Sequence, residues 1–224
     1  MFRFFGLFLA TVLGGCALSP DISPETPAPT APAPSQSAHV PWEVPSLHPI
    51  DVVGDATRVI TTYLAVTDEI GAGGGVDVER MRPVVTSNWF SREEAGFEEY
   101  RTRSIRTIGR TRFDHFEVQS ARIGSEGQIE VAVVLCVDSS KVLVASEDMP
   151  QPPESLVLWL DSEGSEAETD AETLEQWQEF TETSGARFGF REPITVWLVG
   201  DTLSSLRVDS TENWLGAHPC EEQP

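Results

Sequence analysis

Basic residues and long hydrophobic runs are scarce in this sequence of 224 residues. Lysine and arginine together number 15 against 36 aspartates and glutamates, so the formal net charge is -21 at pH 7. Such a charge repels nucleic acids and anionic lipid headgroups, and neither is expected as a partner. The apolar run at residues 4–13 falls well short of the roughly 20 residues that a transmembrane helix needs.

Recognisable catalytic and cofactor motifs are also missing. The sequence has no Gly-x-Ser-x-Gly elbow, P-loop or dinucleotide fingerprint. The glycine run at residues 73–75 lacks the lysine and the preceding strand of a phosphate-binding loop, and is interpreted as a helix stop. The histidines show no metal-ligand spacing among themselves or with the cysteines; they are His39, His48, His115 and His218. No cofactor is therefore expected.

Residues 1–15 have the features of a bacterial lipoprotein signal peptide. Arg3 precedes the apolar run, which ends in Leu13, Gly14, Gly15 and Cys16. These residues resemble a lipobox, in which the cysteine sulfur receives a diacylglyceryl group and becomes the new N-terminus. The resemblance implies that Cys16 is a lipidation site and that the protein is anchored to the outer face of a membrane. The alternative is an ordinary secretory signal with a chance cysteine.

Residues 16–47 contain closely spaced prolines among threonine, alanine and serine. This composition blocks helix and sheet and favours polyproline II, a semi-rigid spacer. We interpret the segment as a stalk that holds residues 48–224, the folded domain, away from the membrane. O-linked sugar on Thr26, Thr30 or Ser35 is left open.

Once Cys16 is assigned to lipid, Cys136 and Cys220 remain as one pair. An extracytoplasmic compartment is oxidising, which favours a disulfide between them. A redox-active pair is the alternative, but the sequence has no Cys-x-x-Cys motif. A structural bridge is therefore predicted.

Three helices are expected at the start of the folded domain. Asp55 is placed to cap an amphipathic helix, which the glycine-rich run at residues 71–75 ends. A short helix is expected over residues 77–82. Ser91 and Glu94 form a capping box for a third helix, and its apolar positions are Phe97, Tyr100, Ile105 and Ile108.

Strands dominate the rest of the domain. They are expected at residues 116–123, 129–138, 142–145, 156–160, 194–199 and 203–208. The segment 129–138 is apolar on both faces past Glu130, as is typical of a central strand covered on both sides. A further helix is expected around Leu174, Trp177 and Phe180. Helices followed by an antiparallel sheet predict the α+β class.

This order of elements resembles the NTF2-like cone fold, in which N-terminal helices pack on a curved antiparallel sheet. The resemblance extends to the Cys-Val-Asp of residues 136–138, to residues 194–199 and to the terminal Asn-Trp-Leu-Gly-Ala-His-Pro-Cys of residues 213–220. These segments look like those of actinobacterial surface lipoproteins with an NTF2-like domain. The resemblance covers roughly residues 50–220, and residues 146–190 depart from it as an acidic insertion.

The acidic insertion offers a candidate calcium site. Hard cations prefer several carboxylate oxygens, and Asp161, Glu163 and Glu166 are close in sequence. The run begins like an EF-hand loop, but Gly164 stands at the fourth loop position where the sixth is required. A solvated loop is the preferred interpretation, and no metal is predicted.

The resemblance also raises an enzyme hypothesis. Some NTF2-like members, such as ketosteroid isomerase, place a tyrosine and carboxylates in the cone pocket for proton transfer. The corresponding candidates are Tyr63, Asp114 and His115. A tyrosine on the apolar face of a helix is more often a packing residue, so catalysis is the minor alternative. We therefore expect a non-enzymatic lipoprotein whose domain serves binding or assembly at the cell envelope. The alternative is a small-molecule carrier or isomerase-like enzyme that uses the cone pocket.

Overall fold

The computed structural model describes residues 47–146, 148–161, 171–184, 186–216 and 220. Every described residue belongs to the unit Trp42–Pro224. The predicted signal peptide, Cys16 and nearly all of the linker lie outside the described residues, as do Glu163 and Glu166. Within the described part, no helix is long and apolar enough to cross a membrane.

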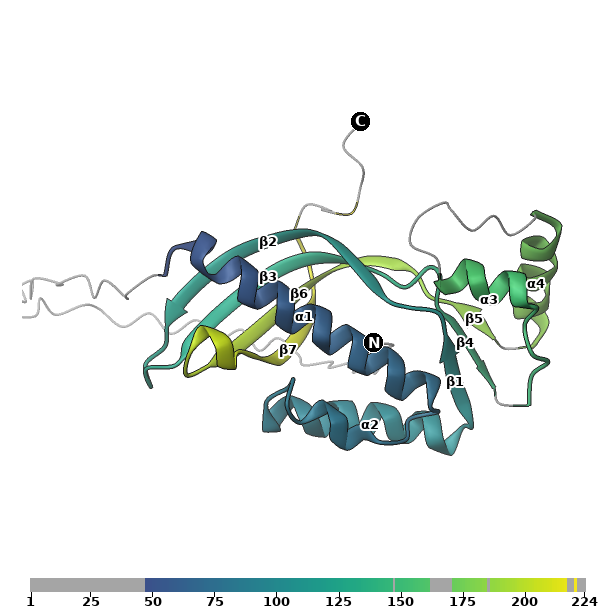
Figure 1. Ribbon diagram of the computed structural model, residues 1–224, viewed down its shortest axis with the longest axis horizontal. Helices are drawn as coiled ribbons and strands as arrows, with labels where there is room; N and C mark the ends of the chain where they lie inside the picture. The colour runs from purple at the N-terminus through teal and green to yellow at the C-terminus, as the bar shows by residue number, and fades with distance from the viewer. Residues whose placement is uncertain (1–46, 147, 162–170, 185, 217–219, 221–224) are drawn as a thin grey trace, which may run out of the picture. The chain divides into compact units, whose positions relative to one another are not determined.

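Helix α1 (Pro49–Ala72) crosses one face of the main sheet (Figure 1). It begins one to two turns before the predicted cap at Asp55, because the fully buried Val52 extends its apolar face toward the N-terminus. Asp55 therefore lies inside the helix, where it pairs with Arg58 at 2.9 Å. The cap prediction was wrong. The glycine run ends the helix as predicted, with positive φ at Gly74 and Gly75.

Helix α2 (Ser87–Thr102) follows the short 3-10 helix η1 (Val78–Met81). The backbone N–H of Trp89 donates to Thr86 Oγ1 at 3.3 Å, so Thr86 is the cap. The predicted capping box was wrong, because Ser91 lies inside the helix. The chain turns at Ser104, whose φ is 48°. Ile105 and Ile108 consequently belong to a strand and not to the helix.

The main sheet has four antiparallel strands in the order β2-β3-β6-β7 (Figure 1). They are β2 (Arg112–Ile123), β3 (Ile129–Asp138), β6 (Arg191–Gly200) and β7 (Arg207–Asn213). Strand β3 pairs along its whole length with β6, and Ala132, Val134 and Cys136 on its second face are also buried. The predicted central strand is confirmed, as is the α+β class. The predicted strand at residues 203–208 begins late, since Leu203–Ser205 forms the 3-10 helix η2.

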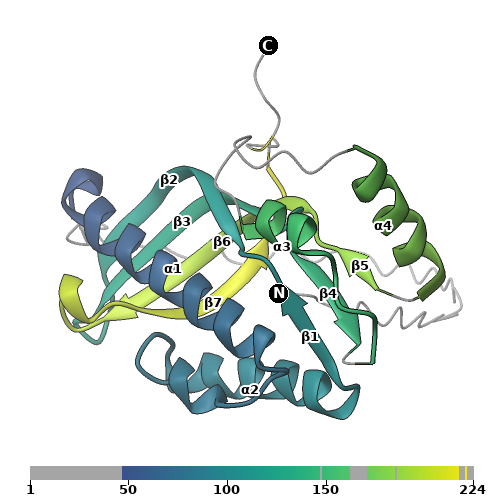
Figure 2. The ribbon, with the colours of Figure 1, turned by 45° about the vertical axis from the view of Figure 1, so that its right-hand side comes forward.

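A second antiparallel sheet has the order β1-β4-β5, and two helices lie near it (Figure 2). Its strands are β1 (Ile105–Ile108), β4 (Leu143–Ser146) and β5 (Arg187–Phe188), and the helices are α3 (Glu154–Asp161) and α4 (Ala171–Ser184). The predicted strand at residues 156–160 was wrong. A run of five apolar residues fits a strand or a buried helix, and here Leu156 and Leu160, four residues apart, are both fully buried on one helix face. Helix α4 confirms the helix predicted in the acidic insertion.

The described residues form two hydrophobic clusters. The larger one lies between the helices and the main sheet, with Tyr63, Trp89 and Phe90 packed against the face of β3 that holds Val133 and Leu135. The smaller one joins β4 to α3. The part of the insertion that the structure describes thus packs on β4 in a cluster separate from the larger one, and the boundary between the two clusters is where a pocket forms.

Candidate functional site

The candidate Tyr63 is a core residue. Its side chain is only 2% exposed, and its hydroxyl donates to Glu93 Oε1 at 2.8 Å, which ties α1 to α2. Burial, together with the charge of Glu93, holds the pKa of Tyr63 well above its usual value. Burial also raises the pKa of Glu93. The two side chains are enclosed by the larger cluster, and the hydrogen bond between them supplies the partner that buried polar groups need.

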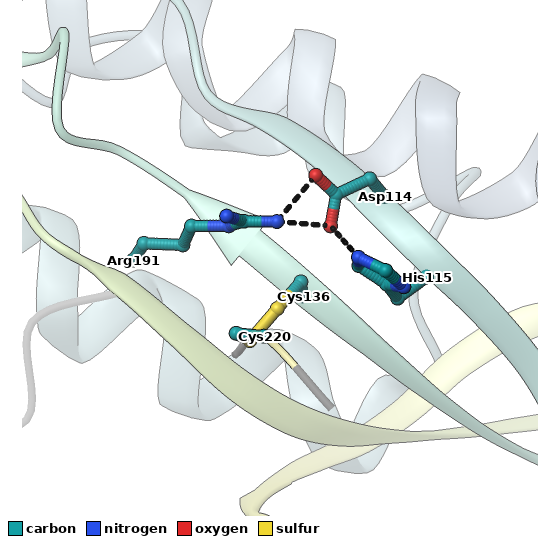
Figure 3. The surroundings of a disulfide bond; sticks show 5 residues. All are labelled: Asp114, His115, Cys136, Arg191 and Cys220. Atoms are coloured by element: carbon teal, nitrogen blue, oxygen red, sulfur yellow. Dashed lines mark hydrogen bonds and ion pairs between the residues drawn. A yellow bond between two sulfur atoms is a disulfide. The ribbon is translucent and has the colours of Figure 1, made fainter. Parts of the chain in front are cut away.

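The candidates Asp114 and His115 lie on β2, beside the bond between Cys136 and Cys220 (Figure 3). Asp114 is the register partner of Cys136, so it stands on the sheet face opposite Leu135 and the larger cluster. Arg191 Nη2 donates to both oxygens of the Asp114 carboxylate, at 2.9 and 2.7 Å. His115 Nε2 is 3.9 Å from Asp114 Oδ1. These two exposed residues do not converge with Tyr63.

The weak metal candidates are only partly described. Asp161 ends α3, and its Oδ1 lies 3.8 Å from Arg110 Nε in an ion pair. Glu163 and Glu166 lie outside the described residues. Within the described ranges, no three histidines, cysteines or acids are grouped so that they could hold a metal ion.

A pocket of about 930 Å³ lies where α1, the β1–β2 turn and α3 meet. Its first wall is one stripe of α1, made of Thr61, Leu64, Ala65, Asp68, Glu69 and Ala72. Its second wall is residues 106–113, and Val157 and Asp161 of α3 close a third side. Ala65 and Ala72 are small and exposed, which leaves room that larger side chains would fill. We call this space the α1 pocket.

Gly109 shapes the turn that forms the second wall. Its φ is 102°, a left-handed conformation that side chains disfavour. A Cβ at this position would lie 2.1 Å from the carbonyl oxygen of Lys141 and 3.3 Å from Leu160 Cβ. Only glycine therefore lets the turn pack against the smaller cluster, and this packing aims residues 110–112 toward α1.

Asp68 holds the turn from the other side. Its carboxylate accepts the Thr111 backbone N–H at 2.8 Å and the Thr111 hydroxyl at 2.7 Å. Burial raises the pKa of Asp68 to about 6, although the two Thr111 hydrogen bonds and Arg110 act in the opposite direction. The pocket thus contains an acid that titrates close to neutral pH.

Arg106 brings a positive charge into the same pocket. Its Nε is buried without a hydrogen-bond partner, and the described residues provide no ion pair for its guanidinium. The acids of the lining have partners elsewhere: Asp68 accepts from Thr111, and Asp161 pairs with Arg110. Glu69 pairs with Arg80. Arg106 is therefore a cation of the pocket lining without a counter-charge among the described residues.

Neither Asp68 nor Arg106 was singled out from the sequence. Asp68 falls within the predicted first helix and Arg106 within the predicted third helix, and the sequence pattern of neither helix marks the residue as functional. A signal was available: residues 80–122 hold nine arginines against six acids in a chain of net charge -21. That local excess of positive charge marks the segment whose strand and turn line the pocket.

The raised pKa of Asp68 predicts a pH dependence of stability. Between pH 3.8 and about 6, the native state holds a proton that the unfolded state has released, so the free energy of unfolding falls as pH rises. The contribution is on the order of 3 kcal/mol for a shift of about two units. Asp68→Asn should remove this contribution to the decrease in the free energy of unfolding with rising pH, as measured by urea unfolding at pH 4, 5, 6 and 7. Glu126→Gln, in the exposed β2–β3 turn, is the control; an Asp68→Asn profile as steep as that of Glu126→Gln would contradict the assignment.

No family model and no curated protein matches the sequence. Fifteen chains of solved structures match. One is the intermembrane space region of the chloroplast protein ARC6, with 8% identity, coverage of 75% of this chain and 98% of that chain, and a TM-score of 0.44. Another is a protein from Catenulispora acidiphila, with 9% identity, coverage of 72% and 89%, and a TM-score of 0.34. Likenesses this weak indicate neither a family nor a function for the chain.

Proposed function

We propose that this chain is a non-enzymatic binding protein of the cell envelope, anchored outside the membrane by lipid on Cys16. Its NTF2-like domain holds a small organic molecule in the α1 pocket. The lipobox-like sequence supports the anchor, and the Cys136–Cys220 pair supports an oxidising compartment. Two helices on one face of a four-stranded antiparallel sheet support the NTF2-like assignment.

The observation that carries the binding function is the α1 pocket. Small-molecule sites occupy about 300–1,000 Å³ and combine mainly apolar walls with a few polar groups, and the α1 pocket, at about 930 Å³, lies in that range. Its apolar walls come from Leu64, Ile108, Phe113 and Val157. The isomerase-like alternative needs Tyr63, Asp114 and His115 in one place. That alternative has less support, since Tyr63 is enclosed in the core and the other two lie on the opposite face of the sheet.

Filling the α1 pocket is predicted to weaken ligand binding without unfolding the domain. Ala65 is exposed on the pocket stripe of α1, so Ala65→Trp places an indole in the pocket and leaves the core intact. The purified full-length chain should bind the neutral fluorescent probe N-phenyl-1-naphthylamine, and Ala65→Trp should weaken binding by roughly tenfold or more, about 1.4 kcal/mol.

The matched control is Ala95→Trp, at an exposed position of α2 that does not line the α1 pocket. It should bind the probe as the wild type does, and circular dichroism should show both variants folded. Failure of the wild-type chain to bind, or equal binding by both variants, would refute the pocket as the binding site.

A further inference from the structure

The charged side chains that line the α1 pocket differ in whether they have a hydrogen-bond or ion-pair partner. Asp68, Glu69 and Asp161 are each engaged by a hydrogen bond or an ion pair, whereas Arg106 has no partner among the described residues. A buried donor left unpaired costs free energy, and one on a charged group costs more than one on a neutral group. Arg106 is therefore the group that gains most from an incoming acceptor.

Guanidinium groups pair best with planar oxyanions, to which they can donate two parallel hydrogen bonds. The other two arginines of the lining are less available. Arg110 faces Asp161 at 3.8 Å, and Arg112 Nη2 donates to the Asp161 carbonyl at 3.2 Å. Arg106, without a partner among the described residues, suits a ligand with one negative charge. A second negative charge on the ligand would approach the carboxylates of Asp68 and Asp161, which line the same pocket.

The remainder of the lining selects the body of the ligand. Leu64 and Ala65 of α1, Ile108 of β1, Phe113 of β2 and Val157 of α3 present carbon atoms to the pocket. Apolar ligand surface buried against such walls contributes about 25 cal/mol per Å². A purely polar anion would not displace water from these apolar walls and would gain little binding free energy from them.

We infer that the α1 pocket binds an amphipathic monoanion, with its carboxylate on Arg106 and its apolar body between α1, β1 and α3. This inference rests on the proposed function and adds the chemical class of the ligand. The local surplus of arginine over acid in residues 80–122 favours approach of an anion here, against the net charge of the whole chain.

The test compares four ligands that share a naphthalene body and differ in charge: 2-naphthoate, 2-naphthamide, 2-naphthylmethylammonium and 2-naphthyl phosphate. Calorimetric titration of the purified full-length chain should rank 2-naphthoate first. Arg106→Gln should weaken 2-naphthoate binding roughly ten- to hundredfold, the range for a hydrogen bond to a charged group, and leave 2-naphthamide unchanged. The unchanged amide also shows that the variant is folded. Arg122→Gln, at the far end of β2 where Arg122 pairs with Glu130, should bind all four as the wild type does.

The outcomes distinguish a failure of the inferred ligand class from a failure of the proposed binding site. If 2-naphthamide binds as tightly as 2-naphthoate, or Arg106→Gln changes nothing, the anion inference is overturned while the pocket proposal stands. If 2-naphthyl phosphate binds more tightly than 2-naphthoate, the inference that the ligand carries a single negative charge is overturned. If none of the four binds the wild-type chain, both proposals fall.

Discussion

Loss of the Cys136–Cys220 bond is expected to lower the free energy of unfolding by about 4 to 5 kcal/mol, the largest effect on stability that we predict. The two residues are 84 positions apart and their Cα atoms lie 5.4 Å apart. Cross-linking so long a loop removes much of the conformational entropy of the unfolded chain. Cys136 is fully buried in the central strand, so the bond fixes Cys220 to that strand.

The double variant Cys136→Ala/Cys220→Ala tests this value by urea unfolding followed through tryptophan fluorescence. Alanine is preferred to serine, because a hydroxyl at the enclosed position 136 would add the cost of an unpaired polar group. The reduced wild-type chain is the control, since it keeps both sulfur atoms and loses only the cross-link. A loss below about 1 kcal/mol on reduction would show that the bond does not restrain the unfolded chain as the entropy model requires.

Hydrogen bonds around this bond connect β2, β6 and the residues after β7. After β7, the Trp214 N–H donates to the Pro193 carbonyl at 3.2 Å, so the chain passes β6 close to the register partner of Cys136. Asp114 and Arg191 form a double hydrogen bond beside the two sulfur atoms (Figure 3). Asp114 is thus engaged next to the disulfide on the outer face of the sheet, and its place in the sequence does not indicate a catalytic role.

The sequence predicts the elements best where a residue pattern has one physical solution. The run of valine, leucine and isoleucine in β3 is apolar on both faces, and a covered central strand satisfies it. The turn between the strands predicted at residues 116–123 and 129–138 is similar, because Gly127 has the positive φ of 86° that the turn needs. The α+β class followed from these patterns and from the early helices.

Prediction failed where a pattern had two solutions that only tertiary contacts separate. Leu156 and Leu160 fit a strand by composition, yet α3 buries both against Leu143 of β4. Ile105 and Ile108 fit the period of the preceding helix until Ser104 turns the chain. The α1 pocket was missed for the same reason, because its walls come from α1, β1 and α3, and two of these three elements were assigned wrongly around the relevant residues.

Substitution of Cys16 is expected to move the protein from the membrane fraction to the soluble fraction or the medium. The reason is the size of the anchor: each buried methylene contributes about 0.8 kcal/mol, and two acyl chains hold a protein stably where one is marginal. The net charge of -21 repels anionic lipids, so electrostatic attraction is not expected to replace the proposed lipid anchor. The loss should therefore be nearly complete.

The measurement is fractionation of cells grown with a clickable palmitate analogue, comparing the wild type, Cys16→Ala and Cys220→Ala. The wild type and Cys220→Ala should carry the label and sediment with membranes, since Cys220 serves the disulfide and not the anchor. Cys16→Ala should carry no label and remain in the supernatant. An unlabelled wild type in the medium would favour the ordinary secretory signal, in which Cys16 is incidental. Continued sedimentation of Cys16→Ala would mean that another part of the chain holds it at the membrane, and the lipobox assignment would be wrong.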